Sequence, residues 1–254
     1  MTNKKLGKAD LHIHSSSSYD GLDKPEVILK KASEMGLNVI AITDHDEIKG
    51  ALLAQKLEKK YGVEVIIGEE ILSNQGEILA LFIKEKVEPG KTLEETVYSV
   101  HSQGGLAIIP HPFSIFPFTR PAVGLKRLYE LIHDKDLLPD GIEVMNSMPT
   151  ARLSSKKSKK LNEKIFNLAE VAGSDAHVVE HIGMSLTFFP GETSEDLKKA
   201  ILERTTTVAG DFISAKEHAK VVRRSIVKMS MRASRKILKP YYKLKNSIHN
   251  RFNT

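Results

Sequence analysis

Short apolar runs of strand length alternate along most of this chain with segments of helical spacing. The clearest run is LNVIAIT (37–43), and similar runs occur at 63–67 and 141–145. Continuous apolar runs of this length are typical of strands that are buried on both faces of a parallel sheet. The alternation predicts an α/β fold, and about seven strand–helix units favour a closed barrel over an open sheet.

Turn and capping signals delimit these units. Gly36 and Gly62 follow predicted helices at 25–35 and 48–61. Thr92 and Glu95 have capping-box spacing at the start of a further helix, predicted to end at Gln103. A first strand is predicted up to Ile13, and the other strands at 77–83, 106–109, 170–173, 186–189 and 206–209. The other helices are predicted at 125–133, 152–168 and 194–203.

Length and composition limit the kind of protein. A chain of 254 residues accommodates one large domain, which we expect over residues 1–210. The absence of Cys excludes disulfides, thiolate metal ligands and cysteine nucleophiles. There is no run of eighteen apolar residues and no cleavable leader pattern, so we expect a soluble, cytoplasmic protein without a transmembrane segment.

Side chains that bind metals follow the ends of the predicted strands. His12 and His14 lie two residues apart, so a strand would point both imidazoles to the same face. Asp20, in an Asp-Gly turn after a run of serines, can return over the strand end as an oxygen ligand. Later strand ends supply His45, Glu70, His111 and the pair Asp175 and His177.

These positions fall in register at one rim of the predicted barrel, where barrels of this type carry their active sites. A single histidine at a strand end is also compatible with a turn residue or a core residue, but five such positions together indicate a metal site. The set is larger than one ion needs. A carboxylate such as Glu70 commonly bridges two ions in hydrolytic sites.

Five motifs carry a resemblance to a known family: Asp10-Leu-His12-Ile-His14, Thr43-Asp44-His45-Asp46, Gly68-Glu69-Glu70, Pro110-His111-Pro112 and Gly173-Ser174-Asp175-Ala176-His177. In this order they resemble the motifs of the PHP (polymerase and histidinol phosphatase) superfamily over residues 5–210. The resemblance implies a distorted seven-stranded (β/α) TIM-like barrel with a metal-dependent phosphoesterase site. It also implies two or three divalent metal ions, Mn, Zn or Fe.

The resemblance also implies how the ligands are shared. His12, His14, Glu70 and Asp175 would hold one ion, Glu70 and His111 a second, and Asp20, His45 and His177 a third. Glu70, Asp175 and His177 would be the catalytic residues.

The chain departs from the family pattern at Glu77. Many family members that cleave small phosphoesters have a further His on the strand that here contains Glu77. Either Glu77 is an oxygen ligand, or the second ion is bound weakly and the enzyme uses fewer ions. His101 is the other histidine in this interval, but it lies in the middle of a predicted helix and is disfavoured as a ligand.

The expected reaction is hydrolysis of a phosphate ester by a metal-bridging hydroxide. The substrate would be a small phosphomonoester, a nucleoside bisphosphate or a short oligonucleotide, so the enzyme would be a phosphatase or an exonuclease. His177 or Asp44 can manage protons, although orienting a ligand imidazole is the favoured role for Asp44. The alternative is a non-catalytic metal-binding regulatory or nucleic-acid-binding module.

Three residues near strand ends are candidates for substrate binding. Arg120 and Arg152 lie in loops where a guanidinium can clamp a phosphate, with solvated surface arginines as the alternative. Asn146 ends a predicted strand and can contact the substrate or support a ligand. The aromatic loop at 113–118 either packs under the barrel rim or stacks on a base.

The tail at 211–254 carries the basic charge of the chain. It contains twelve Lys or Arg and two Asp or Glu, so it has a net charge of +10 within a total of +6. Three roles are possible for the tail. It can form a basic amphipathic helix on an anionic membrane surface, it can contact nucleic acid phosphates, or it can dock Val221, Val222 and Ile226 on the barrel. Docking is favoured for its first part, and Pro240 would interrupt a long helix.

Overall fold

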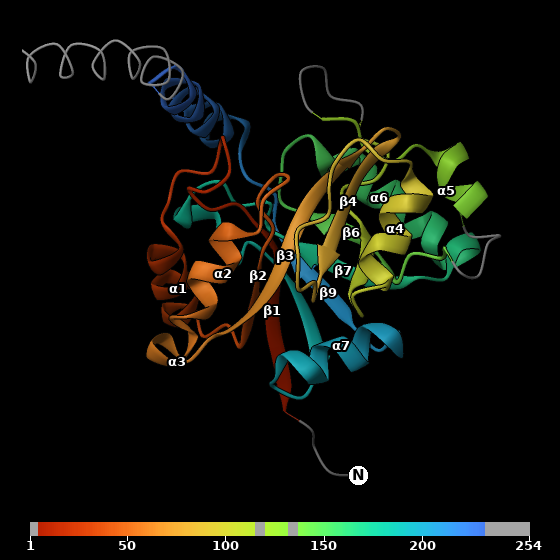
Figure 1. Ribbon diagram of the computed structural model, residues 1–254, viewed down its shortest axis with the longest axis horizontal. Coiled ribbons are helices and arrows are strands. Elements are labelled where there is room, and N and C mark those ends of the chain that lie inside the picture. The colour runs from red at the N-terminus through yellow and green to blue at the C-terminus, as the bar shows by residue number, and fades with distance from the viewer. Residues whose placement is uncertain (1–4, 115–119, 132–136, 232–254) are drawn as a thin grey trace, which may run out of the picture.

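One sheet of nine strands organises the residues that the computed structural model describes, namely 5–114, 120–131 and 137–231 (Figure 1). The strands are β1 (Leu6–Ile13), β2 (Val39–Ile42), β3 (Glu64–Ser73), β4 (Gly76–Leu81), β5 (Leu106–Ile109), β6 (Gly141–Asn146), β7 (Ala169–Gly173), β8 (Ser185–Pro190) and β9 (Thr207–Gly210). Their order in the sheet is β7-β6-β5-β4-β3-β2-β1-β8-β9.

The sheet curls so that β7 returns to β1. An isolated parallel bridge joins Ile13 to Ala176, and the amide of Ser174 donates to Asp10 Oδ1 at 2.9 Å. The predicted barrel-like α/β class is therefore confirmed. The predicted strand number of seven is wrong for the described residues, because β8 pairs antiparallel with β1 and β9 pairs with β8, which extends the sheet to nine strands.

Strand β3 is longer than its apolar run predicts, and it changes partners along its length. It pairs parallel with β2 up to Ile67 and antiparallel with β4 from Gly68 onward. The two residues Asn74 and Gln75 connect β3 to β4 as a hairpin, so the sheet is mixed and not purely parallel. Glu70 thus lies inside β3 and not beyond its end, although it still bridges to His45 at the rim.

Helices cover both sides of the sheet (Figure 1). They are α1 (Pro25–Glu34), α2 (Lys49–Gln55), α3 (Glu58–Tyr61), α4 (Leu93–His101), α5 (Leu125–Leu131), α6 (Ala151–Leu161) and α7 (Ser194–Leu202). The helix predicted at 48–61 is divided into α2 and α3, and the one predicted at 152–168 is α6 followed by a π-helical turn at Asn162–Phe166. The capping box of Thr92 and Glu95 is confirmed.

Three apolar clusters form the core. One joins α1 and α2 to β1–β3, a second joins α4 and α5 to β3–β6, and a third joins the strands to α7. Burial of this apolar surface stabilises the barrel and leaves its polar residues at the rim. None of the described helices is long and apolar enough to cross a lipid bilayer.

The first part of the basic tail is a helix at 215–231, here called the C-terminal helix. Its Val221 is buried against the barrel, whereas Val222 and Ile226 stay largely exposed, so the docking hypothesis holds for Val221 only. The predictions for Pro240 and for the rest of the tail lie outside the described residues, as do those for most of the aromatic loop at 113–118. The division of the chain at residue 210 stays a prediction.

Gly173 permits the close approach of β7 to β1. A Cβ atom at this position would lie 2.3 Å from His12 Cβ and 2.9 Å from the His12 amide nitrogen. We expect Gly173→Ala to lower the free energy of unfolding by about 2 kcal/mol or more, as overpacking of a rigid core does. Urea denaturation measures this loss. Gly124→Ala is the matched control, because its Cβ would meet nothing within 4 Å, and an equal effect of both substitutions would contradict the argument.

Candidate metal centre

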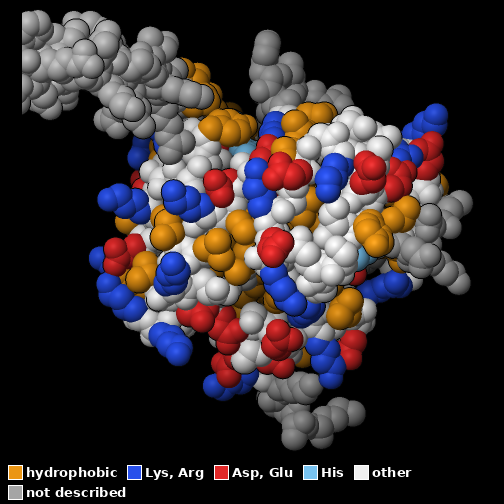
Figure 2. Space-filling model, in the orientation of Figure 1, with side chains coloured by type: hydrophobic (Ala, Val, Ile, Leu, Met, Phe, Trp, Pro, Cys, Tyr) orange, Lys and Arg blue, Asp and Glu red, His pale blue; other side chains and the backbone are white. Residues whose placement is uncertain are grey.

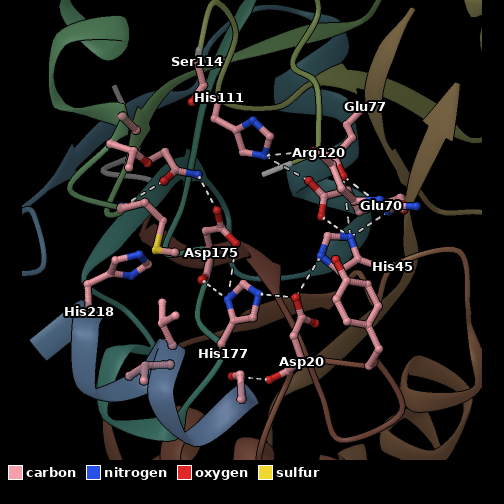
Figure 3. Close-up of a pocket in the computed structure, with 18 of the residues that line it drawn as sticks. Asp20, His45, Glu70, Glu77, His111, Ser114, Arg120, Asp175, His177 and His218 are labelled. Atoms are coloured by element: carbon pink, nitrogen blue, oxygen red, sulfur yellow. Dashed lines mark hydrogen bonds and ion pairs between the residues drawn. The ribbon is translucent and has the colours of Figure 1, made fainter. Parts of the chain in front are cut away.

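The predicted metal ligands converge at the rim of the barrel, where several of them line one pocket (Figure 3). All eight belong to groups whose donor atoms lie within 4.8 Å of one another: His12, His14, Asp20, His45, Glu70, His111, Asp175 and His177. They come from β1, from the loops after β1, β2, β5 and β7, and from β3. The strand-end pattern therefore brings together residues that are far apart in the sequence.

Glu70 lies at the centre and faces four imidazoles. Its Oε1 is 3.0 Å from His111 Nε2 and 3.4 Å from His12 Nε2, and its Oε2 is 2.9 Å from His45 Nδ1 and 3.4 Å from His14 Nε2. Burial alone would raise the pKa of Glu70, but the positive field of His12 and His45 and the hydrogen bond with His111 hold it well below its usual value. The carboxylate therefore stays ionised.

Asp175 and Asp20 complete two sides of the cluster. Asp175 Oδ1 lies 3.2 Å from His14 Nε2 and 3.6 Å from His12 Nε2. Asp20 Oδ2 lies 3.1 Å from His177 Nε2 and 3.3 Å from His45 Nε2. Each carboxylate thus faces at least two ring nitrogens, which is an arrangement that can enclose a cation.

Several buried donor atoms are left without hydrogen bonds in the described part of the chain. Those in the cluster are Nε2 of His12, both ring nitrogens of His14 and Oε1 of Glu77. Burial, together with the neighbouring imidazoles of His177 and His45, lowers the pKa of His14 to about 4, so its ring is neutral. Buried polar atoms without partners are costly, and neutral imidazoles are good ligands for divalent metals. These residues therefore fit a bound divalent metal ion.

A model of one protein family matches this chain along most of its length. The PHP domain model matches residues 10–213. The chain belongs to the PHP domain family. The match includes every predicted ligand, and it ends at the point where the C-terminal helix is about to begin.

This PHP domain is similar to several known proteins. Uncharacterized protein MJ1587 of Methanocaldococcus jannaschii is 44% identical over 150 residues, which cover 55% of this chain and 82% of that protein. A 5'-3' exoribonuclease of Haemophilus influenzae is 43% identical over 67 residues, which cover 26% of this chain and 24% of that protein. A two-domain protein of Bacteroides vulgatus, described as containing a predicted PHP-like metal-dependent phosphoesterase, shares the fold. Its TM-score is 0.69 at 21% identity, over 90% of this chain and 71% of that protein.

Glu143, which was not among the predicted site residues, supports two of the predicted ligands of this PHP domain. Its Oε1 is 3.2 Å from His12 Nδ1, and its Oε2 accepts hydrogen bonds from the His111 amide at 2.7 Å and from Asn146 Nδ2 at 2.9 Å. When His12 Nδ1–H donates to Glu143, the lone pair of His12 Nε2 is directed at the cluster. No sequence signal pointed to Glu143, because it lies within an apolar strand run.

Asn146 and Arg152, both predicted to contact the substrate, lie in different places relative to the pocket. The structure brings Asn146 to the site, where its amide lies 3.4 Å from Asp175 Oδ2. Arg152 is exposed and lies over the ring of Phe212, 5.7 Å from the ring centroid, so the structure does not bring it to the pocket. The role of Arg152 as a substrate contact therefore stays a prediction.

Asp44 and His101 form hydrogen bonds within the protein outside the proposed ligand sets. Asp44 accepts hydrogen bonds from the amide and the hydroxyl of Ser15, both at 2.6 Å, and from the Ser18 amide at 3.1 Å. It therefore holds the serine loop in place, where the sequence predicted that it would orient an imidazole. His101 Nε2 lies 2.8 Å from Asp140 Oδ2, which disfavours a metal role for His101, as expected.

Glu77 and Arg120 form a corner of the site beside His45. Glu77 is 3% exposed, and its Oε1 lies 3.3 Å from Arg120 Nη1 and 3.6 Å from His45 Nδ1. Burial and the charge of Glu70 raise the pKa of Glu77 to about 7. Arg120 also lies 2.9 Å from His45 Nδ1 and pairs with Asp46. The structure thus brings both residues to the pocket, with the guanidinium against the carboxylates.

Proposed function

We propose that this PHP domain is a metal-dependent phosphoesterase that hydrolyses phosphate esters. The observation that carries the proposal is the position of Glu70, a buried ionised carboxylate between four imidazoles. A carboxylate in this position can bridge two cations, as in hydrolytic sites with paired metals. His12 Nε2 and both ring nitrogens of His14, which form no hydrogen bond, add to the same argument.

The proposed ligand sets follow the three faces of the cluster. One ion would be held by His12, His14, Glu70 and Asp175, a second by Glu70 and His111, and a third by Asp20, His45 and His177. Glu77 groups with Glu70 and His45 and also lies 3.8 Å from His111 Nε2, so we assign it as a further oxygen ligand beside Glu70. When bound, such ions, Mn, Zn or Fe, lower the pKa of a coordinated water and neutralise charge on the phosphate.

The side chains of the protein orient the site and supply charge. His177 Nδ1 lies 2.9 Å from the backbone oxygen of Asp175, so Nδ1–H donates there and Nε2 is directed at Asp20. Asn146 holds Asp175 from the other side. Arg120 presents a guanidinium at the pocket wall, where it can bind a phosphate oxygen. Glu70, Asp175 and His177 are the proposed catalytic residues.

The proposed substrate is a small phosphomonoester, a nucleoside bisphosphate or a short oligonucleotide. The pocket over the cluster has a volume of about 680 Å³, which accommodates molecules of this size. The short match to an exoribonuclease supports the oligonucleotide among these candidates.

A substrate screen tests the proposal. Protein loaded with Mn²⁺ or Zn²⁺ is expected to release phosphate or nucleotides from at least one of the three substrate types, and Asp175→Ala is expected to release none while it stays soluble. Metal content measured on the same samples completes the test. Bound metal without hydrolysis of any substrate would contradict the proposed enzymatic activity and favour a non-catalytic metal-binding module.

A further inference from the structure

The C-terminal helix forms one wall of the pocket over the metal centre. Six of its residues line the pocket, and each lies three or four positions from another of the six: His218, Val221, Val222, Ser225, Ile226 and Met229. Residues at this spacing share one face of a helix. The helix therefore turns a continuous and largely apolar face toward the metal ligands, and Figure 3 shows His218 on the same side of the pocket as His177.

The helix is held in this position by the loop that carries Asp20. Ser225 Oγ donates to the Asp20 carbonyl at 2.8 Å. Lys228 Nζ donates to the carbonyl oxygens of Ser18 at 3.1 Å, Ser16 at 3.4 Å and Gly21. A charged donor that meets several carbonyls gives strong hydrogen bonds, so the apolar face is fixed over the site.

A further part of the wall is formed by the connection between β6 and α6 and by the start of α6. Met148 and Thr150 of the connection and Ala151 of α6 line the same pocket. The pocket therefore has a charged floor of metal ligands and an apolar upper part between Met148 and the helix. Val222 is 41% exposed and Ile226 is 55% exposed, so a ligand can reach both side chains. Figure 2 shows hydrophobic side chains near the point where the helix leaves the barrel.

We infer that the upper part of the pocket binds an apolar or aromatic group of the substrate. This inference rests on the proposed function and narrows it to phosphate esters of apolar or aromatic alcohols. The phosphate would lie on the charged floor, because the proposed metal ligands gather there. The alcohol would lie against Val222, Ile226 and Met229, because contact there removes apolar surface from water.

Binding of two phosphonates, which are not hydrolysed, tests the inference. Isothermal titration calorimetry on Mn²⁺-loaded protein compares phenylphosphonate with methylphosphonate. We expect phenylphosphonate to bind about tenfold more tightly, the effect of burying roughly two methylene groups. Ile226→Ser is expected to reduce this preference to about twofold or less, because it removes apolar surface from the wall.

Val227→Ser is the matched control. Val227 is 48% exposed on the same helix but does not line the pocket, so its substitution is expected to leave the preference unchanged. Equal binding of the two phosphonates by the unmodified protein would overturn the inference, and so would an equal loss of preference in both variants. Circular dichroism of each variant verifies that the helix is retained.

The binding ratio also separates this inference from the proposed function. Hydrolysis of phosphate esters together with equal phosphonate affinities would contradict the apolar subsite alone. A tenfold preference for phenylphosphonate without any hydrolysis in the screen would contradict the phosphoesterase activity alone.

Discussion

Replacing Glu70 with glutamine is expected to reduce kcat/KM for a phosphate ester at least about a thousandfold. Glu70 faces His12, His14, His45 and His111, and a neutral amide cannot bridge two cations as a carboxylate does. A cation at a reacting phosphate is worth several kcal/mol of transition-state stabilisation, and about 1.4 kcal/mol corresponds to a factor of ten in rate. Steady-state kinetics and metal analysis of the same preparation measure both effects.

Glu203→Gln serves as the control for the loss of one acidic side chain. Glu203 is exposed at the end of α7, where it pairs with Lys199 at 3.7 Å, and does not line the pocket. We expect this variant to retain the metal content and the rate of the unmodified protein. A Glu70→Gln protein that kept its metal and its rate would show that Glu70 has no bridging role.

Glu143→Gln is expected to weaken metal binding by about 10- to 100-fold, as is typical when a group that orients a ligand is changed. Glu143 uses both oxygens as acceptors, one for His12 and the other for His111 and Asn146. A glutamine has one acceptor oxygen and one donor NH₂, so one side of the new amide would face donors. His12 would then lose the partner that fixes its tautomer.

A competition assay with a chromophoric chelator measures the affinity without any use of enzymatic activity. Glu170→Gln, on the neighbouring strand β7, is the control because Glu170 is outside the pocket. If Glu143→Gln bound metal as tightly as the control, the hydrogen bond between Glu143 and His12 would make no contribution to metal affinity.

Much of the metal centre could be predicted from the sequence, because its ligands lie at strand ends. A short apolar run that is followed by a polar side chain can be recognised in the sequence alone. Parallel strands bring the ends of such runs to one rim of a barrel. His45, His111 and His177 were all found in this way. The order of the motifs then identified the family that the PHP domain match confirms.

Other features depended on contacts that no local pattern records. Glu143 is embedded in an apolar strand, and its role comes from the packing of β6 against His12 and His111. The extension of β3 beyond Ile67 depends on pairing with β4, which the alternation of strands and helices did not predict. The helical spacing of apolar residues in the C-terminal helix can be recognised in the sequence. That this apolar face lines the pocket follows only from the position of the helix in the structure.

The double pairing of β3 gives Glu70 a kinetic property that the loop-borne ligands lack. The Glu70 amide donates to the Asp44 carbonyl at 3.2 Å, its carbonyl accepts from the Asp46 amide at 3.1 Å, and its strand neighbours pair with β4. Amides bonded in this way exchange with solvent only in large openings of the fold. Asp20, in contrast, is carried by a loop. If ions bind as proposed, local openings at the rim would release one from the Asp20 side first, while the Glu70 carboxylate stays in place.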